Sequence, residues 1–138
     1  MRHQVRGRKL NRTASHRKAL MMNLACSLVI HKKINTTDAK AKELRGYVER
    51  LVTYAKKDDV HGRRLIQKKL HGKLGKRVAN ILIHEIAPAY AERSGGYTRI
   101  IKLNNRKNDN APVSLIEFVD LSPVVETETV VETDEKSK

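Results

Sequence analysis

The sequence predicts an α+β fold with two layers, in which about four helices pack on one face of a small mixed sheet. Between residues 15 and 87, apolar residues recur at spacings of three and four, which is the helical period. Short runs of β-branched residues occur at 34–36 and again after residue 96, which indicates an early strand and a late hairpin. A chain of 138 residues suits one core. We therefore expect an extended basic arm at 1–14, a globular domain at 15–120 and an acidic, disordered tail at 121–138.

The opening segment, MRHQVRGRKLNRTASHRKAL, contains seven arginines and lysines and no acid, and the first acid of the chain is Asp38. Residues 1–14 also lack a repeating apolar position, so they have neither a core nor a counter-charge of their own. Fully extended, they would span on the order of 45 Å. We expect an external polyanion to order this arm.

The first helix is expected to begin near Thr13 or Ser15, either of which can cap it, and to end around His31. Its apolar stripe consists of Leu20, Met21, Leu24, Ala25 and Leu28. The second helix should follow the strand at 34–36 and be capped by Thr36 or Thr37. Its stripe consists of Ala41, Leu44, Val48, Leu51, Val52 and Ala55. Both stripes are expected to face the core.

A shorter third helix is expected after Asp58 or Asp59, ending at His71 and Gly72, although Gly62 weakens this prediction. Its core candidates are Leu65, Ile66 and Leu70. The fourth helix should run from about residue 73 to 87, where Pro88 breaks or kinks it. Its inward residues are predicted to be Leu74, Val78, Ile81, Leu82 and Ile86.

The segments TRIIKL and VSLIEFV flank the connection NNRKNDNAP, which is rich in residues that tolerate turn conformations. This pattern predicts a β-hairpin with a basic loop. The acidic end of the chain is expected to be either an idle tail or a transient screen for the basic arm.

Charge is divided unevenly along the chain. The net charge is +14, but residues 120–138 hold six acids and two lysines, a charge of −4, which leaves +18 on residues 1–119. Such a field favours a polyanionic partner, first a nucleic acid and second an anionic membrane surface.

The chain has no tryptophan, one phenylalanine and four tyrosines, so recognition of a nucleic acid through its backbone and shape is favoured over base stacking. No apolar run is long enough to span a bilayer, so a cytoplasmic location is expected.

Motifs for metal binding or catalysis are not recognisable. The six histidines share no ligand spacing, and the single cysteine, Cys26, has apolar neighbours that predict a buried, inert thiol. The carboxylates are dispersed, and HGKLGK lacks the spacing of a phosphate-binding loop. We therefore expect no enzyme activity, no cofactor, no metal and no small-molecule substrate.

The basic clusters are the remaining functional candidates. Charge pairs such as Lys56-Lys57 are equally well explained as a solvated surface, whereas the arm and the hairpin concentrate cations without such an explanation. Tyr97 could stack on a sugar or a base, or it could pack in the core. The predicted RNA-binding residues are Arg2, His3, Arg6, Arg8, Lys9, Arg12, His16, Arg17, Lys18, Lys32, Lys33, Arg93, Tyr97, Arg99, Lys102, Arg106 and Lys107.

Three segments, MRH…GRKLNRTASHRKAL, INTTDAKAKELR and ERSGGYTRIIKL…DNAPVSLIEFVD, together resemble the bacterial large-subunit ribosomal protein seventeen family over about residues 1–120. The resemblance implies an α+β component of the large ribosomal subunit that binds 23S rRNA and lies near large-subunit protein thirty-two. The family usually has glycines where this chain has Asn104 and Asn108, and asparagine tolerates the positive φ of such a turn. The rival interpretations are a DNA-binding protein of the nucleoid type and a small enzyme acting on RNA.

Overall fold

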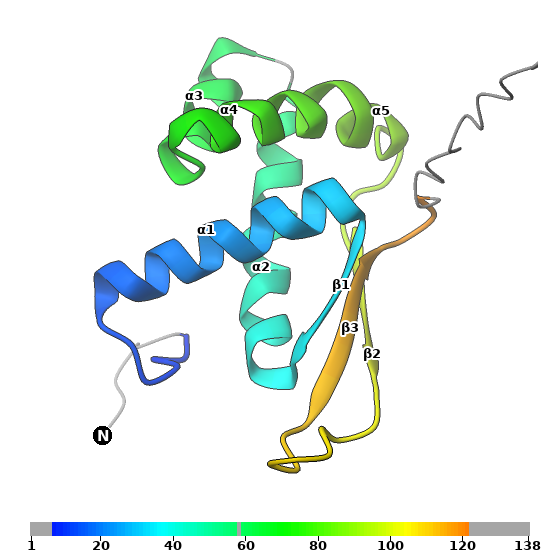
Figure 1. Cartoon of the computed structure of the whole chain (residues 1–138). Coiled ribbons are helices and arrows are strands. Elements are labelled where there is room, and N and C mark those ends of the chain that lie inside the picture. The colour runs from blue at the N-terminus through cyan, green and yellow to red at the C-terminus, as the bar shows by residue number, and fades with distance from the viewer. Residues whose placement is uncertain (1–6, 58, 122–138) are drawn as a thin grey trace, which may run out of the picture.

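The computed structural model describes residues 7–57 and 59–121 (Figure 1). Arg2, His3 and Arg6 of the predicted arm, and residues 122–138 of the predicted tail, lie outside the described residues. The elements are α1 (Ala14–His31), β1 (Lys33–Thr37), α2 (Asp38–Ala55), α3 (Val60–Lys69), α4 (Gly72–Ile81), η1 (Leu82–Ile86), α5 (Ala87–Ala89), β2 (Thr98–Lys102) and β3 (Val113–Phe118). The predicted α+β class is confirmed.

The three strands form one sheet in the order β1-β3-β2. Both pairings are antiparallel, and Ile116 of the central strand lies between Ile34 and Ile100. The prediction of a mixed sheet is therefore wrong. A hairpin fixes β2 and β3 as antiparallel, but β1 and β3 are far apart in the sequence, and no local pattern determines their relative direction.

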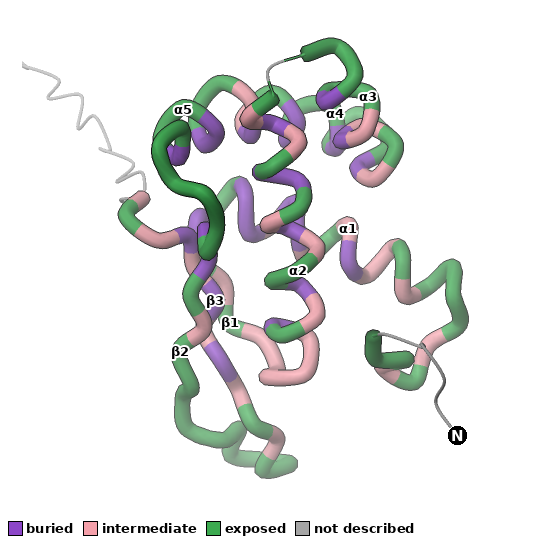
Figure 2. Tube along the Cα trace, turned by 180° about the vertical axis from the view of Figure 1, so that it is seen from behind, coloured by how far each residue is buried: buried purple, intermediate pink, exposed green. Residues whose placement is uncertain are grey.

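Helix α2 packs against all three strands and also against α1, α3 and η1. In Figure 1 it stands between the sheet and the other helices, and in Figure 2 buried positions recur along its length. All six residues of its predicted stripe are buried. Each large aliphatic side chain buried in this way contributes about 1.5–3 kcal/mol to stability. The central packing of the fold thus follows directly from one amphipathic segment.

Helix α1 ends where predicted, and Lys32 follows it in the left-handed region with φ 62°. Three residues of its predicted stripe are buried, whereas Leu20 and Leu24 are only half-buried. The helix buries two further residues, Cys26 and Val29. Burial raises the pKa of the Cys26 thiol, which disfavours its reactive thiolate.

Helix α3 is capped by Asp59, whose side chain accepts a hydrogen bond from the backbone N–H of Gly62. A Cβ on Gly62 would lie 2.5 Å from the Tyr54 carbonyl oxygen. The glycine that we expected to weaken the helix therefore permits the close approach of α3 to the end of α2. Ile66 and Leu70 are buried as predicted, and Leu65 is half-buried.

The predicted fourth helix is α4, η1 and α5 in continuous succession. The helix is not broken at Pro88. The turn before it, η1, is a π-helical turn in which the Ala87 N–H donates to Leu82 O, five residues back. A proline ring clashes with the carbonyl four residues before it, and a wider turn relieves that clash. The inward assignment of Leu74 is wrong, because its side chain is 49% exposed. Gly75 instead faces the backbone of Leu70 at this contact.

Candidate nucleic-acid interface

Residues 7–13 form a turn, here named the N-terminal turn, and not the extended strand that was predicted. Leu10 and Asn11 both have positive φ, and Arg12 N–H donates to Lys9 O at 3.2 Å. Arg17 of α1 reaches back, and its Nη1 donates to Arg12 O at 3.2 Å. The prediction failed for these residues because a cation from the first helix satisfies the carbonyls of the turn.

A groove of about 420 Å³ separates the N-terminal turn from the start of α2. Its walls are Arg8, Lys9, Leu10, Asn11 and Arg12 on one side and Thr37, Ala39 and Lys40 on the other. The guanidinium of Arg8 forms an ion pair with Glu43, in which Arg8 Nε is 3.8 Å from Glu43 Oε1. The groove is therefore shallow and strongly basic, and it lies beside the start of α2.

Arg12 has an unusual environment within this groove. Its Nη1 donates to Leu10 O at 2.9 Å, while its Nε is buried and has no hydrogen-bond partner among residues 7–57 and 59–121. The side chain is thus partly fixed by its own turn. Lys40 was missed in the sequence analysis, and its position just after the predicted threonine cap was the available signal.

The hairpin connection, here named the tip loop (residues 103–112), is ordered by its own hydrogen bonds. Arg106 N–H donates to Ala111 O at 3.0 Å, and Asn110 N–H donates to Arg106 O at 2.9 Å. Positive φ falls at Asn110 and not at the two asparagines named from the resemblance. Figure 2 shows the loop exposed at one end of the molecule. The predicted hairpin and its basic loop are confirmed.

The start of α2 connects the tip loop to the groove. Asp38 N–H donates to Pro112 O at 3.0 Å, and Ser114 Oγ donates to Asp38 Oδ1 at 3.2 Å. Hydrogen bonding from Lys42 lowers the pKa of the Asp38 carboxyl, which is further lowered by the nearby charge of Lys102. The N-terminal turn, the start of α2 and the tip loop therefore share one end of the molecule (Figure 1). We name this region the basic end; its cations are Arg8, Lys9, Arg12, Lys40, Lys102, Arg106 and Lys107.

Several predicted residues lie away from the basic end or are engaged elsewhere. Arg93 Nη1 is 2.9 Å from Asp120 Oδ2, and Arg99 is paired with Glu117 across neighbouring strands. Lys32 is 8% exposed, and its Nζ is 3.4 Å from Glu85 Oε2. The predicted residues His16, Lys18 and Lys33 are exposed.

Tyr97 belongs to the core, which was the alternative considered for it. Its side chain is 2% exposed, and its ring centroid is 5.2 Å from that of Tyr90. Lys56 Nζ lies over the same ring, 5.4 Å from its centroid. The ring is therefore inaccessible for stacking on a base, and Tyr97 is withdrawn from the RNA-facing residues. The sequence could not decide this, because the pairing of the two tyrosines depends on the tertiary fold.

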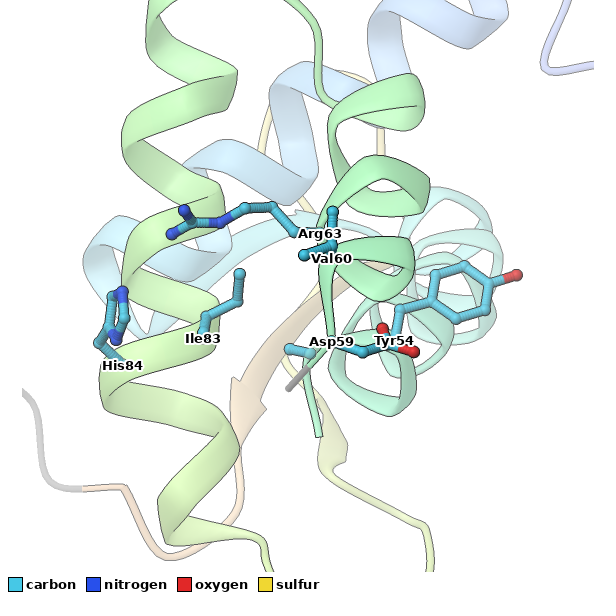
Figure 3. A pocket seen from close by; sticks show the side chains of 7 residues that line it. Tyr54, Asp59, Val60, Arg63, Ile83 and His84 are labelled. Carbon is cyan, nitrogen blue, oxygen red and sulfur yellow. The ribbon is translucent and has the colours of Figure 1, made fainter. Parts of the chain in front are cut away.

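A second hollow, of about 220 Å³, lies between the end of α2, the start of α3 and η1 (Figure 3). It is lined by Tyr54, Ala55, Asp59, Val60, Arg63, Ile83 and His84. In Figure 3, His84 and Asp59 stand on different walls and do not point toward one another. Within residues 7–57 and 59–121, no three His, Cys, Asp or Glu side chains gather closely enough to hold a metal ion. This hollow does not provide a recognisable acid–base or metal centre.

Comparisons with known proteins agree with the resemblance in the sequence. The family described as Ribosomal protein L17 matches residues 20–119. The chain belongs to the ribosomal protein L17 family. One relative is Large ribosomal subunit protein bL17 of Akkermansia muciniphila. It is 54% identical to this L17 family member over 121 residues, which are 88% of this chain and 87% of that protein. The protein of the same name from Syntrophotalea carbinolica is 51% identical over 120 residues, 87% of this chain and 76% of that protein.

The family resemblance described from the sequence is therefore confirmed. A third relative with the same name, from Allorhizobium ampelinum, is 52% identical over 120 residues, 87% of this chain and 83% of that protein. Among the described residues, no helix is both long enough and apolar enough to cross a bilayer. The basic end is accordingly interpreted as the candidate site of a ribosomal protein.

Proposed function

We propose that this chain is a structural, non-catalytic constituent of the large ribosomal subunit in the bacterial cytoplasm, and that it binds 23S rRNA through its basic end. Relatives about half identical to it are named as large ribosomal subunit proteins. The observation that carries the RNA-binding part of the proposal is the groove in which Arg8–Arg12 face Lys40. The residues that line this groove include four cations and no acid, so an external anion can bind there even though Glu43 engages part of Arg8.

The mechanism is neutralisation of phosphates that would otherwise repel each other. Arginine offers a planar fork that matches a phosphate, and lysine offers a mobile point charge. Each phosphate contact releases counterions and contributes about −0.7 to −0.9 to the slope of log affinity against log salt. A site with several such contacts should bind RNA with steep salt dependence.

The remaining predicted residues extend this proposal. Arg2, His3 and Arg6 lie outside the described residues and would lengthen the contact beyond the N-terminal turn. His16 and Lys18 would contact phosphates beside the start of α1, and Lys33 and Arg99 would form a weaker second contact area on the sheet. Arg93, which follows α5, would join it only by leaving Asp120. Lys32 is withdrawn from the RNA-facing residues because it is buried beside Glu85. Large-subunit protein thirty-two, which is implied only by the family resemblance, is proposed as a neighbour.

RNA crosslinking on intact large subunits, mapped to single residues, tests the proposed interface. We expect crosslinks to concentrate on the N-terminal turn, Lys40 and the tip loop. In cell lysate, the chain should sediment with the large subunit and be released by ribonuclease but not by deoxyribonuclease. Crosslinks confined to the last turn of α3, where Lys68 is exposed, or release by deoxyribonuclease, would contradict the proposal.

A further inference from the structure

Arg106 in the tip loop has a guanidinium that is held along one edge and open along the other. Its Nε is 2.9 Å from Asp109 Oδ1, and its Nη2 is 2.6 Å from Asp109 Oδ2. A guanidinium has five N–H groups, and this arrangement uses two of them. The N–H groups of Nη1 and the second N–H of Nη2 remain on the outer edge. The side chain is more than half exposed, so this edge is accessible to a ligand.

Asp109 is itself fixed by the backbone of the loop. Its Oδ1 accepts a hydrogen bond from Ala111 N–H at 3.3 Å. The next residue, Asn110, has φ 51°, and its side chain accepts a bond from Asn105 Nδ2 at 3.0 Å. Hydrogen bonds from Arg106 lower the pKa of the Asp109 carboxyl to about 2, so the carboxylate is ionised at neutral pH.

An exposed ion pair of this kind normally contributes little to folding stability. The tip loop also lies outside the apolar core, which contains none of residues 103–112. The loop backbone bonds the Asp109 carboxylate through the Ala111 N–H, and it bonds the backbone of Arg106. The bidentate pair between the two side chains is therefore better explained by its effect on the orientation of Arg106 than by its effect on stability.

We propose that Asp109 is a positioning residue for RNA binding: it orients Arg106 so that the outer edge of the guanidinium meets an RNA phosphate. This inference rests on the proposed function and deepens it. A freely rotating arginine loses rotamer freedom when it binds, and a prior contact with Asp109 removes part of that cost before binding. Simple charge counting predicts the opposite effect, because removing an acid from an RNA-facing surface should strengthen binding.

The test is filter binding of the full-length chain to purified 23S rRNA from the same bacterium and, separately, to poly(A). Asp109→Asn should weaken binding to 23S rRNA by about three- to tenfold while leaving binding to poly(A) equal or tighter. Glu92→Gln is the matched control, because it removes the same charge from an exposed residue elsewhere. The control should not weaken binding to either RNA.

Two further variants separate positioning from folding and from charge. Arg106→Lys keeps the charge but loses the fork, and should weaken binding to 23S rRNA to a similar extent. Asp109→Asn should have no additional effect in an Arg106→Ala background, because it acts through that residue. All variants should melt at the same temperature as the parent chain.

The outcomes are distinguishable. Equal or tighter binding of Asp109→Asn to 23S rRNA would overturn the inference while leaving the proposed function intact. Additive losses in the double variant would also overturn it. Failure of the parent chain to prefer 23S rRNA over poly(A) would overturn the proposed function and the inference together.

Discussion

Tyr90 illustrates how a single polar group is accommodated inside the core. Its side chain is buried, and its hydroxyl is in hydrogen-bond contact with Tyr97 O at 3.2 Å and with Val119 O. These contacts join the segment after α5 to the two ends of the hairpin. Burial raises the pKa of the Tyr90 hydroxyl to about 12, because the phenolate would be poorly solvated there.

Substitution Tyr90→Phe should therefore destabilise the protein by about 1 kcal/mol at neutral pH, because the hydrogen bond that the hydroxyl donates to these carbonyls is lost. The parent chain should also lose stability as the pH rises from about 10 to about 12, because only the folded state keeps the Tyr90 proton in that range. Urea unfolding of both proteins at pH 8 and pH 11 measures this. The difference between them should shrink at pH 11, and an unchanged difference would contradict the assignment.

At the scale of the elements, the joints between helices depend on glycines at particular contacts. A Cβ on Gly75 would overlap the carbonyl group of Leu70, so this residue sets the close approach of α4 to the end of α3. Gly46 lies on the exposed side of α2, and a Cβ there would meet nothing within 4 Å. The two glycines therefore provide a matched pair with opposite expectations.

Gly75→Ala should destabilise the protein by about 2–3 kcal/mol, since the backbone that it meets cannot move without shifting α3. Gly46→Ala should stabilise it by about 0.5–1 kcal/mol, because alanine is the better residue inside a helix. Thermal unfolding followed by circular dichroism measures both changes. Equal effects of the two substitutions would show that the joint between α3 and α4 is not tightly packed.

These elements also show how far the sequence alone could lead. The stripe of α2 was predicted completely, because its period is unbroken and its cap lies at Thr37. Leu74 was misassigned, since periodicity cannot reveal that Gly75 occupies the contact with α3. The N-terminal turn was missed because its order comes from Arg17, a cation that the sequence pattern assigned only to phosphates. Local patterns thus predicted the elements, while contacts between distant residues determined the details of the site.

At the scale of the whole molecule, the apolar core and the basic end are separate. The buried core contains residues from the helices and the sheet and none from the N-terminal turn. Leu10 is half-buried there, whereas Arg8 contacts Glu43 through its guanidinium and Arg12 donates to Leu10 O within the turn. The body of the protein should therefore fold without the turn, whereas RNA binding should depend on it.

The most direct measurement is a competition between full-length chain and a chain lacking residues 2–12 for incorporation into large ribosomal subunits. Both are expressed together with distinguishable tags, and their ratio in purified subunits is compared with their ratio in the whole cell. A chain that stops after Leu121 is the control, because it loses a longer segment but keeps the basic end. We predict a folded truncated protein that is under-represented in subunits by about tenfold or more, with normal incorporation of the control. Incorporation of the chain lacking 2–12 at the level of the full-length chain would contradict the account.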